Sequence, residues 1–416
     1  MQKANLKLRL TVMNFLQFAV WGSYLISLGG YMMGTLGYSG LQVGAIYGTM
    51  GVASLFMPGV IGIIADKYVN AERLLAICHL LSAAFLIGVS QNADYALAYP
   101  LFLLVNIFYM PTIALTNTIS YSLMSRNNMD IAATFPSIRV WGTVGFIAAM
   151  WLVGLCGWAQ SAMQLYVSAA LGVTLAVFAL TLPPSPPNKQ VGPERSLASV
   201  LGLDALVLFK NYNMSVFFIF SMLLGAALQV TNTFGTPFLD SFKPDYADSI
   251  AVKYPTILLS LSQISETLFI LSIPFFLRRF GIKSVMLMSM LAWVLRFGLF
   301  GIGNPGDGFV FLILSMIVYG MAFDFFNVSG SMFVDKEVDP SMRGSAQGLF
   351  MMMTNGVGAI LGGFGSGYIV DLYKNAETQA VDWSPVWFIF AGYALVIAIL
   401  FAILFRYRGD VATKQL

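Results

Sequence analysis

Long apolar stretches recur along the whole chain, and the polar residues gather in short segments between them. Each stretch approaches or exceeds the roughly 20 residues that an α-helix needs to cross the hydrocarbon core of a bilayer. The pattern predicts an all-α polytopic membrane protein with twelve transmembrane helices. We place the spans at residues 8–35, 41–65, 72–91, 98–124, 132–156, 161–182, 214–239, 254–277, 283–302, 308–334, 343–371 and 384–406.

Composition supports this fold class and excludes most others. Hydrophobic residues make up 58% of the 416 residues, charged residues make up 10%, and the mean hydropathy is +0.78. A soluble globular domain has roughly 45–50% apolar and about 25% charged residues, so a soluble enzyme, a disordered chain and a nucleic-acid-binding domain are all excluded. One histidine and two cysteines are too few for a His-based triad, a zinc site or a disulfide framework. We expect no metal and no cofactor.

The positions of the Lys and Arg residues predict the orientation of the chain. With both termini placed in the cytoplasm, seventeen of the 22 fall in cytoplasmic segments and three fall outside. The other two, Arg139 and Arg296, lie within predicted spans. This distribution follows the positive-inside rule. We therefore expect a multi-pass protein of an inner or plasma membrane with both termini in the cytoplasm.

A proline-rich segment that begins at Pro183 divides the twelve spans into six plus six. The two halves also show weak internal similarity, because Tyr109 and Asn117 in the fourth span have the same spacing as Tyr319 and Asn327 in the tenth. Transporters built from such repeats bind their ligand near the bilayer midplane. We predict an N-terminal six-helix bundle, a cytoplasmic linker, a C-terminal six-helix bundle and a cytoplasmic tail at residues 1–182, 183–213, 214–406 and 407–416.

Four charged residues lie well inside predicted spans, away from their ends, namely Arg139, Glu266, Arg296 and Asp324. A charge at mid-bilayer costs about 2.5–3.5 kcal/mol on insertion scales, so each needs a reason. One interpretation is structural pairing that holds the bundles together, with Arg296 and Asp324 on adjacent helices as a candidate pair. The other is a proton-linked ligand site, because burial and a nearby arginine act in opposite directions on how tightly a carboxylate holds a proton.

Polar and aromatic side chains share helix faces near these charges. Arg139, Thr143 and Phe146 follow one another at the spacing of a single helical face. The C-terminal half adds amides, a carboxylate and rings at similar spacings: Gln229, Asn232, Gln263, Glu266, Tyr319 and Phe323. A nucleoside needs partners for its ribose hydroxyls, its base edge and its base face. A sugar would need similar groups, and interhelical hydrogen bonding would also explain the amides.

Short motifs add a family resemblance. The loop Gly62-x-x-x-Asp66-Lys67, followed by Arg73, resembles the G-x-x-x-D-R/K signature of the major facilitator superfamily. The chain is most similar to the nucleoside:proton symporters within that superfamily, the bacterial nucleoside permeases, through segments at residues 135–146, 201–205, 262–266, 319–327 and 345–348. In the first of these segments Ser137 departs from the pattern of these permeases, which usually have a second proline after the one matching Pro136.

This resemblance implies the major facilitator fold of two six-helix bundles and a proton-coupled nucleoside importer that works by alternating access. Substrate would bind at the midplane between the bundles, through residues matching Arg139, Thr143, Phe146, Gln229, Asn232, Gln263, Glu266, Tyr319 and Phe323. Asp324 and Glu266 would couple transport to protons, with Asp324 the better proton carrier and Glu266 an acceptor for a ribose hydroxyl. Asp66, Lys67 and Arg73 would form a conformational latch.

The implied partners are a nucleoside, a proton and the lipid bilayer of a bacterial inner membrane, with no nucleic acid, and we expect a monomer. Two alternatives remain open at this point. One is a proton-linked sugar or oligosaccharide carrier, which competition by nucleosides would distinguish. The other, more distant, is a membrane receptor that binds a nucleoside without moving it, which counterflow in proteoliposomes would distinguish. An enzyme is not expected, since the spans hold no nucleophile–base pair.

Overall fold

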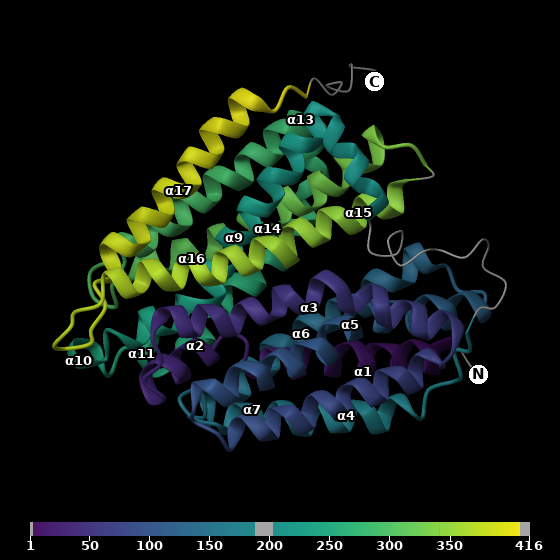
Figure 1. Cartoon of the computed structure of the whole chain (residues 1–416), viewed down its shortest axis with the longest axis horizontal. Helices are drawn as coiled ribbons and strands as arrows, with labels where there is room; N and C mark the ends of the chain where they lie inside the picture. The colour runs from purple at the N-terminus through teal and green to yellow at the C-terminus, as the bar shows by residue number, and fades with distance from the viewer. Residues whose placement is uncertain (1–2, 188–202, 341, 408–416) are drawn as a thin grey trace. The chain divides into compact units, whose positions relative to one another are not determined.

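The computed structural model describes residues 3–187, 203–340 and 342–407, and nearly all of them are helical (Figure 1). Within these residues nine helices are long and apolar enough to cross a membrane. One of them, Pro255–Ile302, contains a break at Gly281, whose φ is 75°, and it supplies two spans. Together with α1 (Lys3–Gly22) and α7 (Met163–Ala179), the described residues hold the twelve predicted spans, which confirms the fold class.

The chain divides into two compact units. One comprises Met1–Tyr38 and Thr49–Val200, and the other comprises Ser39–Gly48 and Leu201–Leu416. The six-plus-six division did not anticipate that the first turns of the second span would group with the C-terminal residues. The predicted domain boundaries themselves stay predictions, because residues 188–202 of the linker and 408–416 of the tail lie outside the described residues.

In the N-terminal unit, α1 packs against α6 (Ile131–Leu155) and α7. In the same unit, α4 (Ala71–Ser90) packs against α5 (Tyr95–Arg126) and α7. Aspartates begin two of these helices, since Asp94 and Asp130 accept hydrogen bonds from backbone N–H groups in the first turns of α5 and α6. The remaining elements of this unit are α2 (Leu28–Gly30), the π-helix η1 (Tyr31–Thr35) and α3 (Gly40–Lys67) from Thr49 onward.

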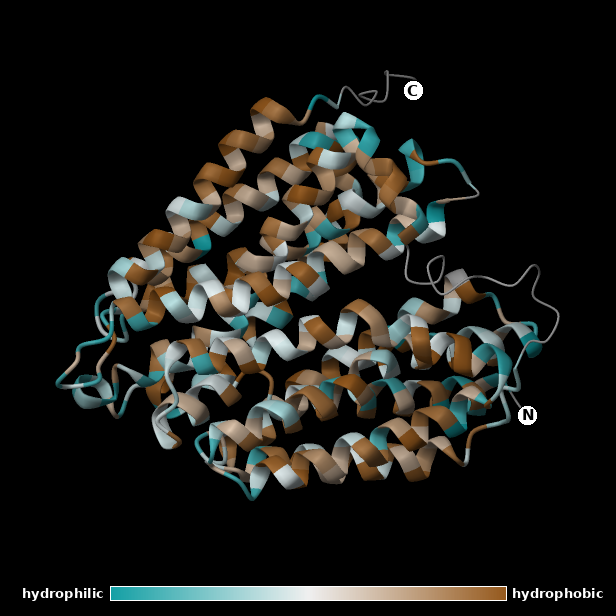
Figure 2. Ribbon diagram, in the orientation of Figure 1, coloured by the Kyte–Doolittle hydropathy of each residue, from teal (hydrophilic) through white to brown (hydrophobic). Residues whose placement is uncertain are grey.

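In the C-terminal unit, α13 (Leu261–Ile302) packs against α14 (Phe309–Glu337) and α17 (Trp383–Leu404). In the same unit, α9 (Tyr212–Asp240) packs against the π-helix η3 (Met352–Gly358) and α16 (Ala359–Leu372). Hydrophobic residues cover most faces of these helices (Figure 2), as expected where helices contact lipid. The shorter elements are η2 (Leu203–Lys210), α10 (Lys243–Tyr246), α11 (Ile250–Lys253), α12 (Pro255–Leu259), α15 (Arg343–Met351) and α16 (Ala359–Leu372).

The described start of the predicted linker is held by the N-terminal unit. The buried carboxylate of Glu72 accepts a hydrogen bond from the Ser185 N–H at 2.8 Å, and the Ala71 N–H donates to the Ser185 carbonyl at 3.1 Å. Arg126 Nη1 donates to the Pro184 carbonyl at 2.9 Å. The start of the proline-rich segment is therefore hydrogen-bonded to the first turn of α4 and to the last turn of α5.

Glycines bring α9 into direct backbone contact with η3 and α16. A Cβ atom added at Gly225 would lie 2.0 Å from the Thr354 carbonyl oxygen. A Cβ atom at Gly358 would lie 2.5 Å from the Met222 carbonyl oxygen, and one at Gly362 would lie 2.5 Å from that of Ala226. Small residues at these positions let the helix backbones approach closely, which is how helices associate in a membrane.

We predict that Gly225→Ala lowers the thermal stability of the detergent-purified protein. The clashing atom belongs to the backbone, so α9 must move away from η3, and overpacking of this kind costs about 1–3 kcal/mol. Thermal unfolding followed by size-exclusion chromatography measures the effect. The matched control is Gly365→Ala, because no atom lies within 4 Å of a Cβ placed there. Equal unfolding temperatures for the two variants would contradict the prediction.

Candidate functional site

The predicted binding face formed by Arg139, Thr143 and Phe146 lies on α6, which packs against α1. The Arg139 guanidinium carbon lies 4.0 Å from the centroid of the Phe18 ring, a cation–π contact. Phe146 is buried and meets the edge of Trp21, with ring centroids 6.3 Å apart at 90°. Thr143 is half-buried between them along the helix. Aromatic residues of α1 therefore orient both ends of the predicted face.

Glycines explain why α6 approaches α1 so closely at this face. A Cβ atom at Gly145 would lie 2.1 Å from the Phe15 carbonyl oxygen, and a Cβ atom at Gly22 would lie 2.3 Å from the Phe146 carbonyl oxygen. Neither position accepts a larger residue unless the helices separate. The position of Arg139 over Phe18 thus depends on these two small residues.

A buried polar network lies behind the same face and was not predicted. Gln17 Nε2 donates to Thr112 Oγ1 at 2.7 Å, and Gln17 Oε1 lies 2.8 Å from His79 Nε2. The Tyr109 hydroxyl donates to the Gln17 carbonyl at 2.9 Å. Tyr109 also contacts Trp21, with ring centroids 5.7 Å apart. Polar residues in three separate spans were the only available signal, and the sequence does not show that they meet.

The predicted residues of the C-terminal unit lie on α9, α13 and α14. Gln229 is buried and contacts Thr233 Oγ1 at 3.4 Å, and Asn232 is half-buried on the same helix. On α13, Gln263 and Glu266 are half-buried. The Gln263 Oε1 atom has no hydrogen-bond partner among the described residues. Unsatisfied amide oxygens of this kind are rare away from water or ligand.

Aromatic rings form a continuous group where α13 and α14 meet. Tyr319 and Phe323 stack with centroids 6.3 Å apart and an interplanar angle of 8°. Trp293 meets Tyr319 edge-on at 5.9 Å. The helices approach closely because a Cβ atom at Gly320 would lie 2.6 Å from the Ser265 backbone. The rings of the predicted pair Tyr319 and Phe323 therefore lie next to each other in parallel planes.

Arg296 does not pair with Asp324, so that candidate pair was wrong. Arg296 is buried, donates from Nη1 to the Ser315 carbonyl at 3.0 Å and to Ser262 Oγ at 3.3 Å, and stacks over Tyr319 at 4.4 Å. Ser315 precedes Asp324 by nine residues, which is about 13 Å along a helix. The two spans are adjacent as expected, but their axial register separates the charges.

Asp324 is buried, with 4% of its surface exposed, and its Oδ2 atom has no hydrogen-bond partner among the described residues. The carboxylate of Glu266 repels it electrostatically. Both carboxylates lie near Tyr319, over which Arg296 stacks. A buried carboxylate is costly while it stays charged and uncompensated. The cluster around Tyr319 therefore has the surroundings that reversible proton binding requires.

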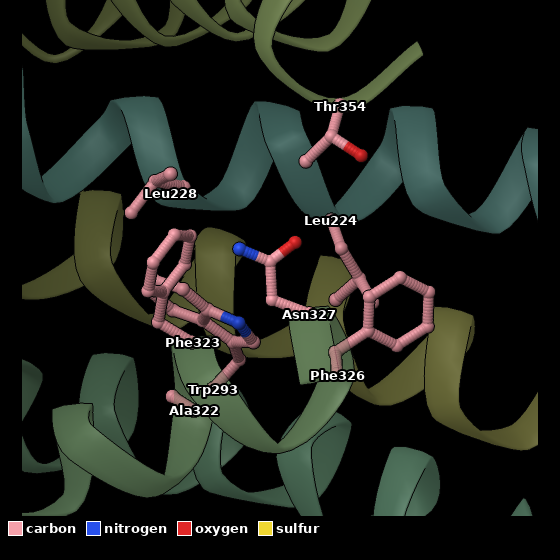
Figure 3. A pocket seen from close by; sticks show the side chains of 8 residues that line it. All are labelled: Leu224, Leu228, Trp293, Ala322, Phe323, Phe326, Asn327 and Thr354. Atoms are coloured by element: carbon pink, nitrogen blue, oxygen red, sulfur yellow. The ribbon is translucent and has the colours of Figure 1, made fainter. Parts of the chain in front are cut away.

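A pocket opens within the C-terminal unit beside this cluster (Figure 3). Its empty volume is about 250 Å³, including space open to solvent. Of the site residues predicted from the sequence, Phe323 alone lines it, and Leu228 of the lining is the chain neighbour of Gln229. The full lining is Leu224, Leu228, Trp293, Ala322, Phe323, Phe326, Asn327 and Thr354.

The profile of the family described as Nucleoside H+ symporter matches residues 4–410. The chain belongs to the nucleoside H+ symporter family.

Individual relatives agree with this membership. Nucleoside permease NupG of Escherichia coli (strain K12) is 53% identical over 407 residues, which cover 97% of each chain. Xanthosine permease of the same organism is 52% identical over 409 residues, covering 98% of this chain and 97% of the relative. A crystal structure of nucleoside transporter NupG superposes with a TM-score of 0.92 at 52% identity and covers 97% of this chain and all of that one.

The resemblance inferred from short motifs is therefore confirmed, and so is the major facilitator fold. This symporter is a proton-coupled nucleoside transporter and not an enzyme. Family membership sets aside the sugar carrier and the receptor, which the residues alone had left open. The roles of the individual site residues stay predictions.

The proposed latch of the symporter lies at the turn between α3 and α4. Asp66, Lys67 and Arg73 are all exposed there. Their role as a latch stays a prediction. The buried carboxylate of this turn is Glu72, which the sequence analysis did not single out and which the proline-rich segment engages.

Proposed function

We propose that the symporter imports nucleosides across the bacterial inner membrane by alternating access, with both termini in the cytoplasm. Three observations support this. Lys and Arg residues concentrate in the segments assigned to the cytoplasm. The described helices are long and apolar enough to span a bilayer. The family couples nucleoside movement to protons, so an inward proton gradient drives uptake without a nucleotide-binding motif.

The substrate site consists of the residues predicted from the sequence. Arg139 and Thr143 offer hydrogen-bond donors, while Tyr319 and Phe323 offer an aromatic surface for the base. Glu266 accepts a hydrogen bond from a ribose hydroxyl. The amides that complete the site, together with the remaining ring, are Gln229, Asn232, Gln263 and Phe146. Binding at the bilayer midplane and a monomeric state stay predictions.

Asp324 carries the proton in this proposal. The observation that supports it most directly is the burial of Asp324 with an oxygen that lacks a partner among the described residues, in electrostatic contact with Glu266. A carboxylate in such surroundings gains from binding a proton and can release it when a charged partner or water arrives. Glu266, which accepts the ribose hydroxyl in this proposal, is the carboxylate that acts electrostatically on Asp324, so the sites for the proton and the nucleoside adjoin each other.

Uptake of radiolabelled uridine, adenosine and xanthosine in transporter-deficient cells tests the proposed function. We expect saturable uptake that collapses on addition of a protonophore, because the proton gradient supplies the driving force. The ranking of the three substrates defines the selectivity. Absence of uptake for all three, with the protein shown to be in the membrane, would contradict nucleoside import. Uptake that persists with the protonophore would contradict proton coupling.

A further inference from the structure

Asn327 faces the pocket of the C-terminal unit without a partner. It lies one helical turn after Phe323 on α14 and is half-buried. Its side chain makes no hydrogen bond to any described residue. Figure 3 shows the amide between Phe323 and Trp293 on one side and Phe326 on the other. An amide within a membrane span normally finds a partner on a neighbouring helix, so this one is available to a polar group that enters the pocket.

The π-helix η3 brings Thr354 to the same pocket. A π-helical segment holds an extra residue per turn, which changes the direction of the side chains within it. Close contact of the Thr354 backbone with Gly225 fixes this turn against α9. The Thr354 hydroxyl donates to the Phe350 carbonyl at 2.9 Å, so its oxygen keeps the capacity to accept a hydrogen bond. The pocket therefore combines a free amide, an acceptor and aromatic rings.

We propose that Asn327 is a specificity-determining residue that binds the hydrogen-bonding edge of the nucleobase. An amide places an acceptor beside a donor, which matches base edges where an N–H group lies beside a carbonyl, as in uridine and inosine. Phe323, which is half-buried at the edge of the pocket, contacts a face of the same base. This inference rests on the proposed function, but it assigns residues that the predicted site does not include.

Comparing uridine with 3-methyluridine tests this assignment, since the methyl group removes the N3–H donor. For the unmodified symporter we expect a KM for 3-methyluridine at least ~10-fold above that for uridine, because a buried acceptor is left unpaired. In Asn327→Leu the KM for uridine should rise about 10-fold and the two substrates should become equivalent. The maximal rate should change little. A merely structural role for Asn327 would not alter the ratio between two substrates.

Asn355→Leu is the matched control, because Asn355 is exposed on η3 and does not line the pocket. It should keep the uridine preference. Asn327→Ser serves if the leucine variant fails to reach the membrane, since serine is polar but too short to reach the base. An unchanged substrate ratio in a membrane-inserted Asn327 variant would overturn the inference. Loss of discrimination against 2′-deoxyuridine instead would assign Asn327 to the ribose and also overturn it.

The controls separate this inference from the proposed function. If the unmodified symporter transports no nucleoside, the proposed function fails before Asn327 is tested. If it transports uridine and 3-methyluridine equally well, nucleoside transport stands and the assignment of Asn327 falls.

Thr354→Val removes the hydroxyl with little change of shape, and we expect it to weaken uptake of nucleosides whose base edge offers a donor.

Discussion

Asp324→Asn should abolish uphill accumulation of nucleoside while leaving nucleoside exchange intact. Asparagine has the shape of a protonated aspartate but cannot bind and release a proton. The buried position of Asp324 therefore stays neutral throughout the cycle. A membrane potential of 100 mV supplies about 2.3 kcal/mol per charge, equivalent to roughly a 50-fold concentration ratio. The variant should lose this ratio entirely, as measured by radiolabelled uridine in energised cells and by counterflow in proteoliposomes.

The matched control is Asp307→Asn. Asp307 is exposed in the loop that precedes α14, so the same chemical change should leave accumulation and its response to protonophore unchanged. Full pH-driven accumulation by Asp324→Asn would remove Asp324 from the role of proton carrier. Loss of counterflow together with accumulation would indicate that Asp324 is needed for substrate movement itself.

The fold could be predicted from the sequence because a bilayer imposes a strong constraint on helix length and polarity. The division of the longest helix illustrates this. The chain is helical on both sides of Gly281, yet the basic residues Arg278, Arg279 and Lys283 mark a point that cannot lie in lipid. The predicted spans at 254–277 and 283–302 end and begin around them. Burial alone would not have separated these two helices.

The interior contacts could be predicted only in part. Helical spacing shows which residues share a face, and the stacking of Tyr319 on Phe323 follows from it. Spacing does not fix the axial register between helices. Arg296 therefore reaches Ser315, although the sequence made Asp324 an equally reasonable partner. The hydrogen bonds of Gln17 to residues of two other helices escaped prediction for the same reason.

Local departures from the α-helix also limited how much of the candidate site could be predicted from the sequence. The π-helix η3 spans Met352–Gly358, and no feature of its sequence distinguishes it from an ordinary turn. Because the extra residue changes the side-chain directions, a 3.6-residue period does not place Thr354 in the pocket. Asn327 was noted for its spacing from Tyr319, but its lack of a hydrogen-bond partner among the described residues became visible only in three dimensions.

Glu266→Gln should weaken nucleoside binding while preserving proton-driven accumulation, the opposite of Asp324→Asn. Glutamine keeps the length of Glu266 but replaces a charged acceptor with a neutral one, and hydrogen bonds to charged groups contribute about 1.5–3 kcal/mol against 0.5–1.5 kcal/mol for neutral ones. The KM for uridine should therefore rise roughly 10-fold. Glu337→Gln, at the exposed end of α14, is the control and should leave KM unchanged.

The ribose itself distinguishes the two roles that Glu266 can have. If its carboxylate accepts a hydrogen bond from the 2′-hydroxyl, uridine and 2′-deoxyuridine should differ in KM for the unmodified symporter and converge in Glu266→Gln. If Glu266 instead carries the proton, the variant should lose accumulation and keep its preference for uridine. Because Glu266 and Asp324 repel each other electrostatically, neutralising one also changes the surroundings of the other. The assignment therefore requires both variants, measured for KM and for accumulation under the same proton gradient.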